Sequence, residues 1–127
     1  MEKLQYSSAR LTEEYGIRIG RWTQYAADRE LPFDAMWCVI PPGGSSERDQ
    51  HPEVELSVVA SGSADYEAPG SGERTEAGQG AAVLLPSREP HVIHNRSDSE
   101  PLVLLSIYWM PEEAAPPGQA APEEAGE

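Results

Sequence analysis

Short apolar or alternating segments, separated by clusters of turn-forming residues, follow one another along most of the chain. Successive side chains of a strand point to opposite faces, so short alternating or apolar runs between turns predict β-strands. We expect strands at residues 17–25, 33–41, 51–62, 63–68, 81–86, 91–95 and 101–109. A Pro-Pro-Gly-Gly run ends the second of them, and a Gly-rich turn spans 69–74. Helical character is confined to residues 8–15, where we expect one short helix capped by Ser7 or Ser8.

This pattern predicts an all-β protein. Regularly spaced strands joined by turns are typical of a sandwich or barrel, and 127 residues are the length of one domain. We divide the chain into an N-terminal extension with a short helix and strand (1–30), a barrel (31–110) and a tail (111–127). The tail consists mainly of Pro, Ala, Gly and Glu. We expect it to be disordered, because it cannot bury enough apolar surface to offset its ordering entropy.

The chain is acidic, with a formal net charge of -13, and its basic residues form no cluster. Nucleic-acid binding depends on clustered Lys and Arg, so we expect no such partner. No apolar run has the length of a membrane span, and the first residues lack the apolar core of a secretory signal, so we expect no membrane association. The lone Cys38 cannot form an intrachain disulfide, and we interpret it as a buried thiol in a cytoplasmic protein.

Four ionisable side chains share one face of the predicted strand around residues 49–58. Asp49, His51, Glu53 and Glu55 are each two residues apart, whereas the alternate positions include Val54, Leu56 and Val58. If this face is solvated, the acids are an ordinary polar stripe. If it lines a barrel interior, their burial needs a compensating cation, and histidine with carboxylate is a usual ligand set for a divalent metal.

These residues resemble the first motif of the cupin superfamily. That motif runs from a glycine over five residues to His-x-His, over three or four more to Glu, and over six more to glycine. Gly43, His51, Glu55 and Gly62 occupy matching positions, and Asp49 replaces the first histidine of the pair.

A downstream segment resembles the second cupin motif, which runs from glycine over five residues to Pro-x-Gly, over two to His, and over three to Asn. Gly80, Pro86, His91 and Asn95 match it, and Arg88 replaces the inner glycine. The resemblance covers residues 32–111. It implies a small single-domain cupin, which is a double-stranded β-helix (jelly-roll) barrel.

The resemblance also implies a metal centre. Carried over position by position, the ligands are His51, Glu55 and His91, and Asp49 is a candidate fourth ligand. Two histidines and one carboxylate suit one divalent ion, Zn²⁺ or Fe(II) before Mn or Ni. The competing interpretation is a degenerate cupin without a metal.

Further residues near the two motifs each have two candidate roles or a place outside the ligand set. Glu53 lies in phase with the ligands and is a candidate general base, or simply a rim carboxylate. Arg88 is a candidate for binding a substrate carboxylate, or forms a surface salt bridge. Tyr66 and Tyr108 are candidates for the pocket lining. His94 is out of phase with His91, so we place it outside the ligand set.

Fold does not determine function, because cupins include enzymes, sensors and storage proteins. The leading hypothesis is a metal-dependent enzyme acting on a polar small molecule. The alternative is a non-catalytic ligand- or metal-binding sensor. Segments 31–43, 51–62 and 95–111 show a weaker resemblance to the cupin half of proteins joined to a methionyl-tRNA-synthetase-like domain. Those proteins form N–N bonds in hydrazine natural products, which implies secondary metabolism and a synthetase-like protein partner.

We also expect a homodimer. Small barrels expose sheet edges that favour pairing between chains. The predicted interface is the segment 17–25, in which Trp22 and Tyr25 offer aromatic surface to bury.

Overall fold

The computed structural model describes residues 1–25 and 30–112, and the predicted tail lies outside these residues from 113 onward. The described chain consists of strands, turns and two 3₁₀ turns, η1 (Tyr6–Ser8) and η2 (Trp22–Gln24). The strands are β1 (Thr12–Glu14), β2 (Ile17–Arg21), β3 (Asp34–Ile40), β4 (Val54–Ser61), β5 (Ser63–Ala68), β6 (Glu73–Gly78), β7 (Ala82–Leu85), β8 (Val92–Asn95) and β9 (Leu102–Trp109). The all-β prediction is confirmed. No helix among the described residues is long and apolar enough to cross a membrane.

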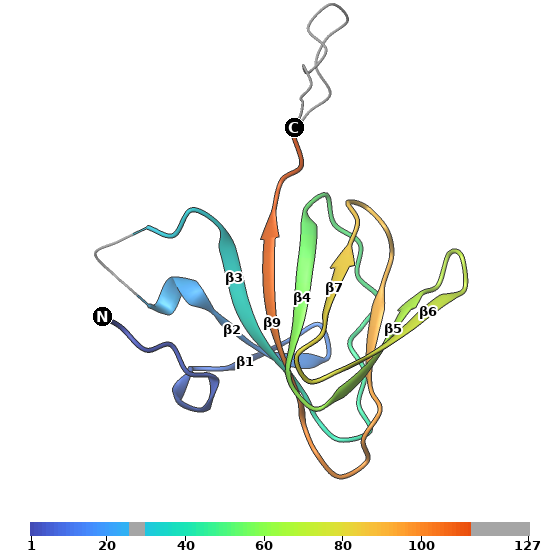
Figure 1. Cartoon of the computed structure of the whole chain (residues 1–127), viewed down its shortest axis with the longest axis horizontal. Coiled ribbons are helices and arrows are strands. Elements are labelled where there is room, and N and C mark those ends of the chain that lie inside the picture. The colour runs from blue at the N-terminus through green and yellow to red at the C-terminus, as the bar shows by residue number, and fades with distance from the viewer. Residues whose placement is uncertain (26–29, 113–127) are drawn as a thin grey trace, which may run out of the picture.

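Two antiparallel sheets form the barrel. One has the order β1-β2-β3-β9-β4-β7, and the other has the order β6-β5-β8. Strand β9, the last among the described residues, lies between β3 and β4 and so joins segments that are distant in sequence (Figure 1). This crossover places β3, β9 and β4 side by side as one wall of the barrel.

Alternation along each strand directs one set of apolar side chains into the space between the sheets. The six-stranded sheet contributes Ile19, Ile40 and Leu104, and the smaller sheet contributes Tyr66 and Ile93. All of these are buried. The alternation that predicted strands from sequence therefore also identifies the interior face.

The helix expected over residues 8–15 is wrong. Thr12–Glu14 instead pairs with Ile17–Arg21 as a hairpin, and the two turn residues, Tyr15 and Gly16, have φ values of 55° and 76°. Two successive positive φ values are typical of the type I′ turn that matches strand twist. The Ala, Arg, Leu and Glu of this segment favour a helix intrinsically, but pairing with a neighbouring strand overrides that weak preference.

Strand β6 was missed because it carries almost no hydrophobic signal. Of its six residues only Ala77 is buried, and the others are exposed. An edge strand of this kind forms because its backbone pairs with β5, and no alternation of apolar side chains marks it in the sequence.

The N-terminal segment packs on the outer face of β2 and β3. Gly20 allows the approach, because a Cβ atom there would lie 2.8 Å from Leu11 Cδ2 and 3.2 Å from the Arg10 carbonyl oxygen. Trp22 packs against Trp37, with ring centroids 5.5 Å apart. The aromatic residue chosen from sequence as a dimer surface is therefore partly covered by its own chain.

Candidate metal centre

A short backbone bridge brings together the two segments that contain His51 and His91. Asp49 and His91 are directly paired: the Asp49 N–H donates to the His91 carbonyl oxygen at 3.0 Å, and the His91 N–H donates to that of Asp49 at 2.9 Å. The Arg88 N–H also donates to the His51 carbonyl oxygen at 2.7 Å. The segment before β4 and the segment before β8 are thus fixed relative to each other by main-chain bonds.

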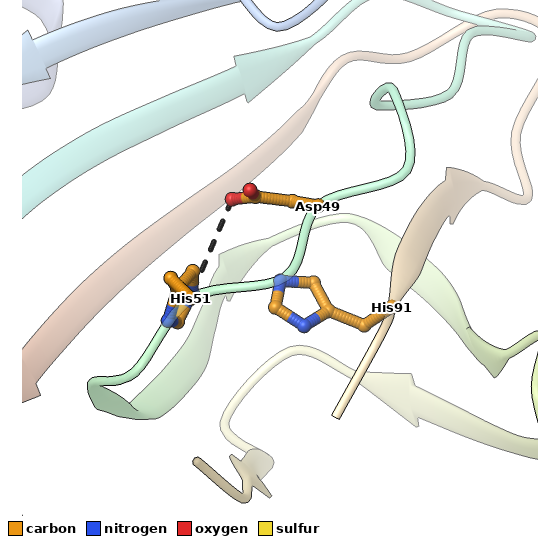
Figure 2. Close-up of side chains that lie close together, drawn as sticks. All are labelled: Asp49, His51 and His91. Atoms are coloured by element: carbon orange, nitrogen blue, oxygen red, sulfur yellow. Dashed lines mark ion pairs between the residues drawn. The ribbon is translucent and has the colours of Figure 1, made fainter. Parts of the chain in front are cut away.

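Ligand atoms of Asp49, His51 and His91 all lie within 4.8 Å of one another, and Figure 2 shows the three side chains converging from these two segments. Glu55, at the start of β4, contacts both imidazoles. Its Oε1 lies 3.1 Å from His51 Nε2 and 3.8 Å from His91 Nε2. On the other side of His51, Asp49 Oδ2 lies 3.9 Å from the same Nε2 atom. Glu55 thus lies beside both histidines, whereas the three residues whose ligand atoms all lie within 4.8 Å of one another are Asp49, His51 and His91.

The four residues differ in exposure. Glu55 and His91 are 5% and 4% exposed, whereas the Asp49 side chain is 37% exposed. The site therefore has a buried base formed by Glu55 and His91 and a more open side at Asp49.

The donor set fits a divalent cation. His51 Nδ1 lies 3.0 Å from the Glu53 carbonyl oxygen, and His91 Nδ1 lies 3.2 Å from the Glu89 carbonyl oxygen. A carbonyl only accepts, so each Nδ1 carries a hydrogen, and a ring whose Nε2 gives up its proton to make room for a cation presents that lone pair toward the cluster. Two such nitrogens with carboxylate oxygens are a usual ligand set for a transition metal.

Strong electrostatic coupling joins Glu55 and His51. Burial by itself raises the pKa of Glu55, but hydrogen bonds from His51 and Ser106 and the nearby imidazoles hold this pKa below its usual value. The hydrogen bond to Glu55 raises the pKa of His51 to about 9, against the opposing effect of burial. The Glu55 carboxylate therefore favours a positive charge beside it, which either an imidazolium or a metal ion supplies.

A cavity of about 170 Å³ opens beside the cluster. Besides Asp49, His51, Glu53 and Glu55, the lining comprises Tyr15, Arg21, Met36 and Tyr108. Tyr108 had been proposed from sequence. Tyr15, Arg21 and Met36 come from the N-terminal hairpin and β3, and local sequence gave no signal that they would reach the site. A larger cleft of about 500 Å³ lies away from the ligand cluster and shares only Arg21 and Tyr108 with this cavity.

The two residues proposed for catalysis occupy different positions. The Glu53 side chain lines the cavity, and its Oε1 lies 3.6 Å from His51 Nδ1. Arg88 is exposed and is not among the lining residues. Its φ of 66° is a left-handed value that explains why a glycine suits this turn.

His94 lies outside the cluster. Its Nδ1 lies 2.6 Å from Ser45 Oγ, and its Nε2 lies 2.9 Å from Glu67 Oε1. Both ring nitrogens are therefore engaged elsewhere, in agreement with the out-of-phase position of His94 in the sequence. Tyr66 is buried and bonded to Ser57, so it belongs to the core and not to this cavity.

Solved structures similar to this chain are also barrels. A cupin 2 conserved barrel domain protein from Salinispora arenicola is 28% identical, with a TM-score of 0.74 over 86% of this chain and 88% of its own. A polyketide cyclase from Streptomyces resistomycificus is 23% identical, with a TM-score of 0.67 over 85% of this chain and 78% of its own. The cupin domain of a transcriptional regulator from Enterobacter cloacae is 21% identical, with a TM-score of 0.61 over 76% and 99%.

The family model for the cupin domain matches residues 36–108, which include both histidine segments. That match spans more than half of the chain and agrees with the double-stranded β-helix expected from the motif spacing. Cupins commonly bind a metal, and the described residues include a possible His/Asp site for one. The chain belongs to the cupin family.

Proposed function

We propose that the protein binds one divalent metal ion through His51, His91, Glu55 and Asp49 and uses it to act on a polar small molecule. The observation that carries this proposal is the convergence of the His51 and His91 Nε2 atoms on the Glu55 carboxylate, beside an open cavity that His51 and Glu55 line. A buried carboxylate flanked by two histidines is costly unless a positive charge compensates it. The cavity gives a small molecule direct access to that charge.

The ligand set suits Fe(II) or Zn²⁺ best, and Mn or Ni as well. Such an ion supplies Lewis-acid polarisation or oxygen activation at positions that the protein leaves open. The chain's own residues would orient the substrate: Met36 and Tyr108 offer apolar surface, and Arg21, whose guanidinium donates two hydrogen bonds to Glu14, lines the same cavity. Glu53 lines the same cavity and is placed to hold or accept a proton from a bound molecule.

Arg88 is the weaker of the two catalytic candidates. Its side chain is exposed, so it could bind a substrate group only outside the cavity. Its backbone N–H, by contrast, donates to the His51 carbonyl oxygen and so helps to position His51. We therefore retain Glu53 as the candidate general base, and we propose for Arg88 a role in the turn.

The second candidate function is a non-catalytic ligand- or metal-binding cupin. The similar structures include both an enzyme, the polyketide cyclase, and a domain of a transcriptional regulator. Because these are less than a quarter identical to this chain, they support the fold and leave the choice to experiment. The narrow form of the enzyme proposal, N–N bond formation with a synthetase-like partner, rests on the sequence resemblance alone.

Metal content tests the proposal directly. The wild type, His51→Ala and His94→Ala are purified without added metal and analysed for Fe, Zn, Mn and Ni. His94 is the matched control, because it is a histidine of the same barrel with both nitrogens engaged outside the cluster. We expect about one metal ion per chain in the wild type and the control, and a small fraction of this in His51→Ala. Equal metal content in all three proteins would refute the site.

Enzyme and binder are then separated by turnover. The metal-loaded protein is incubated with its bound small molecule, identified by mass spectrometry after denaturation. Conversion of that molecule supports the enzyme, and its release unchanged supports the binder.

A further inference from the structure

Two fully buried serines face each other on the interior wall of the barrel. Ser57 of β4 and Ser106 of β9 are direct cross-strand partners, and both are 0% exposed. Their hydroxyl groups have different partners. Ser57 Oγ lies 2.7 Å from the Tyr66 hydroxyl, within the core. Ser106 Oγ donates to Glu55 Oε2 at 2.8 Å.

We infer that Ser106 is a positioning residue that fixes the carboxylate of Glu55 for metal binding. A glutamate carboxylate rotates about its last side-chain bond unless both oxygens are held. Here Oε2 accepts the Ser106 hydroxyl, and Oε1 faces His51 and His91. The serine thus determines which oxygen is presented to the cluster. This inference rests on the proposed metal site.

Cys38 extends the same chain of contacts by one step. Its Sγ lies 3.7 Å from Ser106 Oγ, and the thiol is buried. Because burial raises the pKa of the thiol to about 12, Cys38 stays protonated and is available as a weak donor to Ser106. A thiol that donates to the Ser106 oxygen leaves the serine hydrogen directed at Glu55. The three side chains therefore form an ordered series from the core to the metal centre.

A residue that hydrogen-bonds a metal ligand, as Ser106 does with Glu55, has a measurable effect on metal affinity. Groups that hydrogen-bond a metal ligand orient it, and their removal typically costs about 10–100-fold in metal affinity. Ser57 offers an internal comparison, because it is equally buried, lies directly opposite, and bonds Tyr66 and no ligand. If the loss of a buried hydroxyl by itself weakened metal binding, Ser106→Ala and Ser57→Ala would lose metal affinity equally.

The test compares Co²⁺ binding by full-length wild type, Ser106→Ala and Ser57→Ala. Affinity is measured by chelator competition, the visible spectrum of bound Co²⁺ reports ligand geometry, and thermal melts confirm folding. We expect Ser106→Ala to bind Co²⁺ about 10–100-fold more weakly with an altered spectrum, and Ser57→Ala to retain both properties. Equal affinities and spectra in the two variants would overturn the positioning role alone. A wild type that binds no Co²⁺ would overturn the metal site and this inference with it.

A second pair of variants, in which position 106 keeps nearly the same volume, tests the inference if Ser106→Ala does not fold. Cys38→Ala/Ser106→Cys keeps the volume at position 106 but replaces the hydroxyl with a weaker donor, and Cys38→Ala alone is its control. We expect several-fold weaker Co²⁺ binding in the double variant than in the control. Equal Co²⁺ binding in these two proteins would contradict the inference.

Discussion

Asp49 and His91 each donate a backbone N–H to the other's carbonyl oxygen, at 3.0 and 2.9 Å, and in this way join two segments that are far apart in sequence. Reciprocal hydrogen bonds of this kind hold directly opposed residues of an antiparallel pair in register. The bridge positions two candidate ligands through the main chain. The candidate metal site is thus part of the barrel's hydrogen-bonded framework.

Replacing Glu55 should weaken metal binding far more than replacing Glu53. Glu55→Gln keeps the shape but removes the buried charge that contacts both Nε2 atoms. Glu53 lies nearer Nδ1 of His51, which faces away from the cluster. Removing a hydrogen-bond partner of a metal ligand typically lowers metal affinity about 10–100-fold. We expect Glu55→Gln, which alters a ligand itself, to lower Zn²⁺ affinity by at least this factor, and Glu53→Gln to bind Zn²⁺ nearly as the wild type does. Isothermal titration measures both, and a larger loss in Glu53→Gln would reverse the assignment.

Gly20→Ala should destabilise the fold. The added methyl group would meet the end of the Leu11 side chain (Cδ2) at 2.8 Å and the Arg10 carbonyl oxygen at 3.2 Å, so the Leu11 side chain must move and the backbone at Arg10 must give by a few tenths of an ångström. Overpacking of this kind costs about 1–3 kcal/mol in the free energy of unfolding. Gly78→Ala is the control, because nothing lies within 4 Å of the new methyl group there. Urea denaturation compares the two, and equal midpoints would show that the segment does not pack closely on β2.

Arg88→Gly should leave stability equal or slightly higher and should preserve metal binding. The φ of 66° at Arg88 favours glycine by about 1 kcal/mol, which offsets the entropy that glycine loses on folding. Arg48→Gly is the control, since Arg48 is also exposed but is not among the non-glycine residues with positive φ, and it should be destabilised by about 0.5–1 kcal/mol. Thermal melts with and without Zn²⁺ provide the comparison. Loss of metal binding in Arg88→Gly would assign its side chain a role in the site.

Cys38 should be unreactive in the native protein. Burial raises the pKa of its thiol to about 12, and the thiolate is the reactive form. We expect no labelling by a thiol-specific disulfide reagent at pH 8 and complete labelling in guanidinium. Because the folded pKa lies above the unfolded value, this thiol's contribution to stability is complete below about pH 9 and is lost as the pH rises toward 12. Rapid labelling of the folded protein at pH 8 would contradict this.

Self-association remains a prediction, and we propose a second candidate surface for it. The outer face of β4, β7 and β9 carries Leu56, Leu84 and Ile107, which are paired across the strands, and Leu84 is 59% exposed. An uncharged face suits a second copy of this acidic chain, because it adds no like-charge contact. We expect a dimer mass by light scattering and a shift to monomer in Leu84→Glu. Trp22→Ala is the comparison, and a shift to monomer only in that variant would restore the segment 17–25 as the interface.

The sequence by itself predicted the strands with strong alternation, and its resemblance to the two cupin motifs brought His51, Glu55 and His91 together as candidate ligands. The strands follow from a local rule, since side-chain direction alternates along a strand. The candidate ligands follow from the position-by-position resemblance to the family's two motifs. The pattern also correctly excluded His94. Where the local signal was weak or misleading, as in β6 and residues 8–15, the prediction failed.

Only the tertiary structure decided which side chains surround those ligands. Arg21 and Tyr15 reach the cavity because the N-terminal hairpin pairs with β3, and Ser106 stands behind Glu55 because β9 inserts between β3 and β4. Such neighbours depend on register and crossover between strands distant in sequence. Those are fixed by burial of the shared core and by backbone pairing, and no local pattern of residues encodes them.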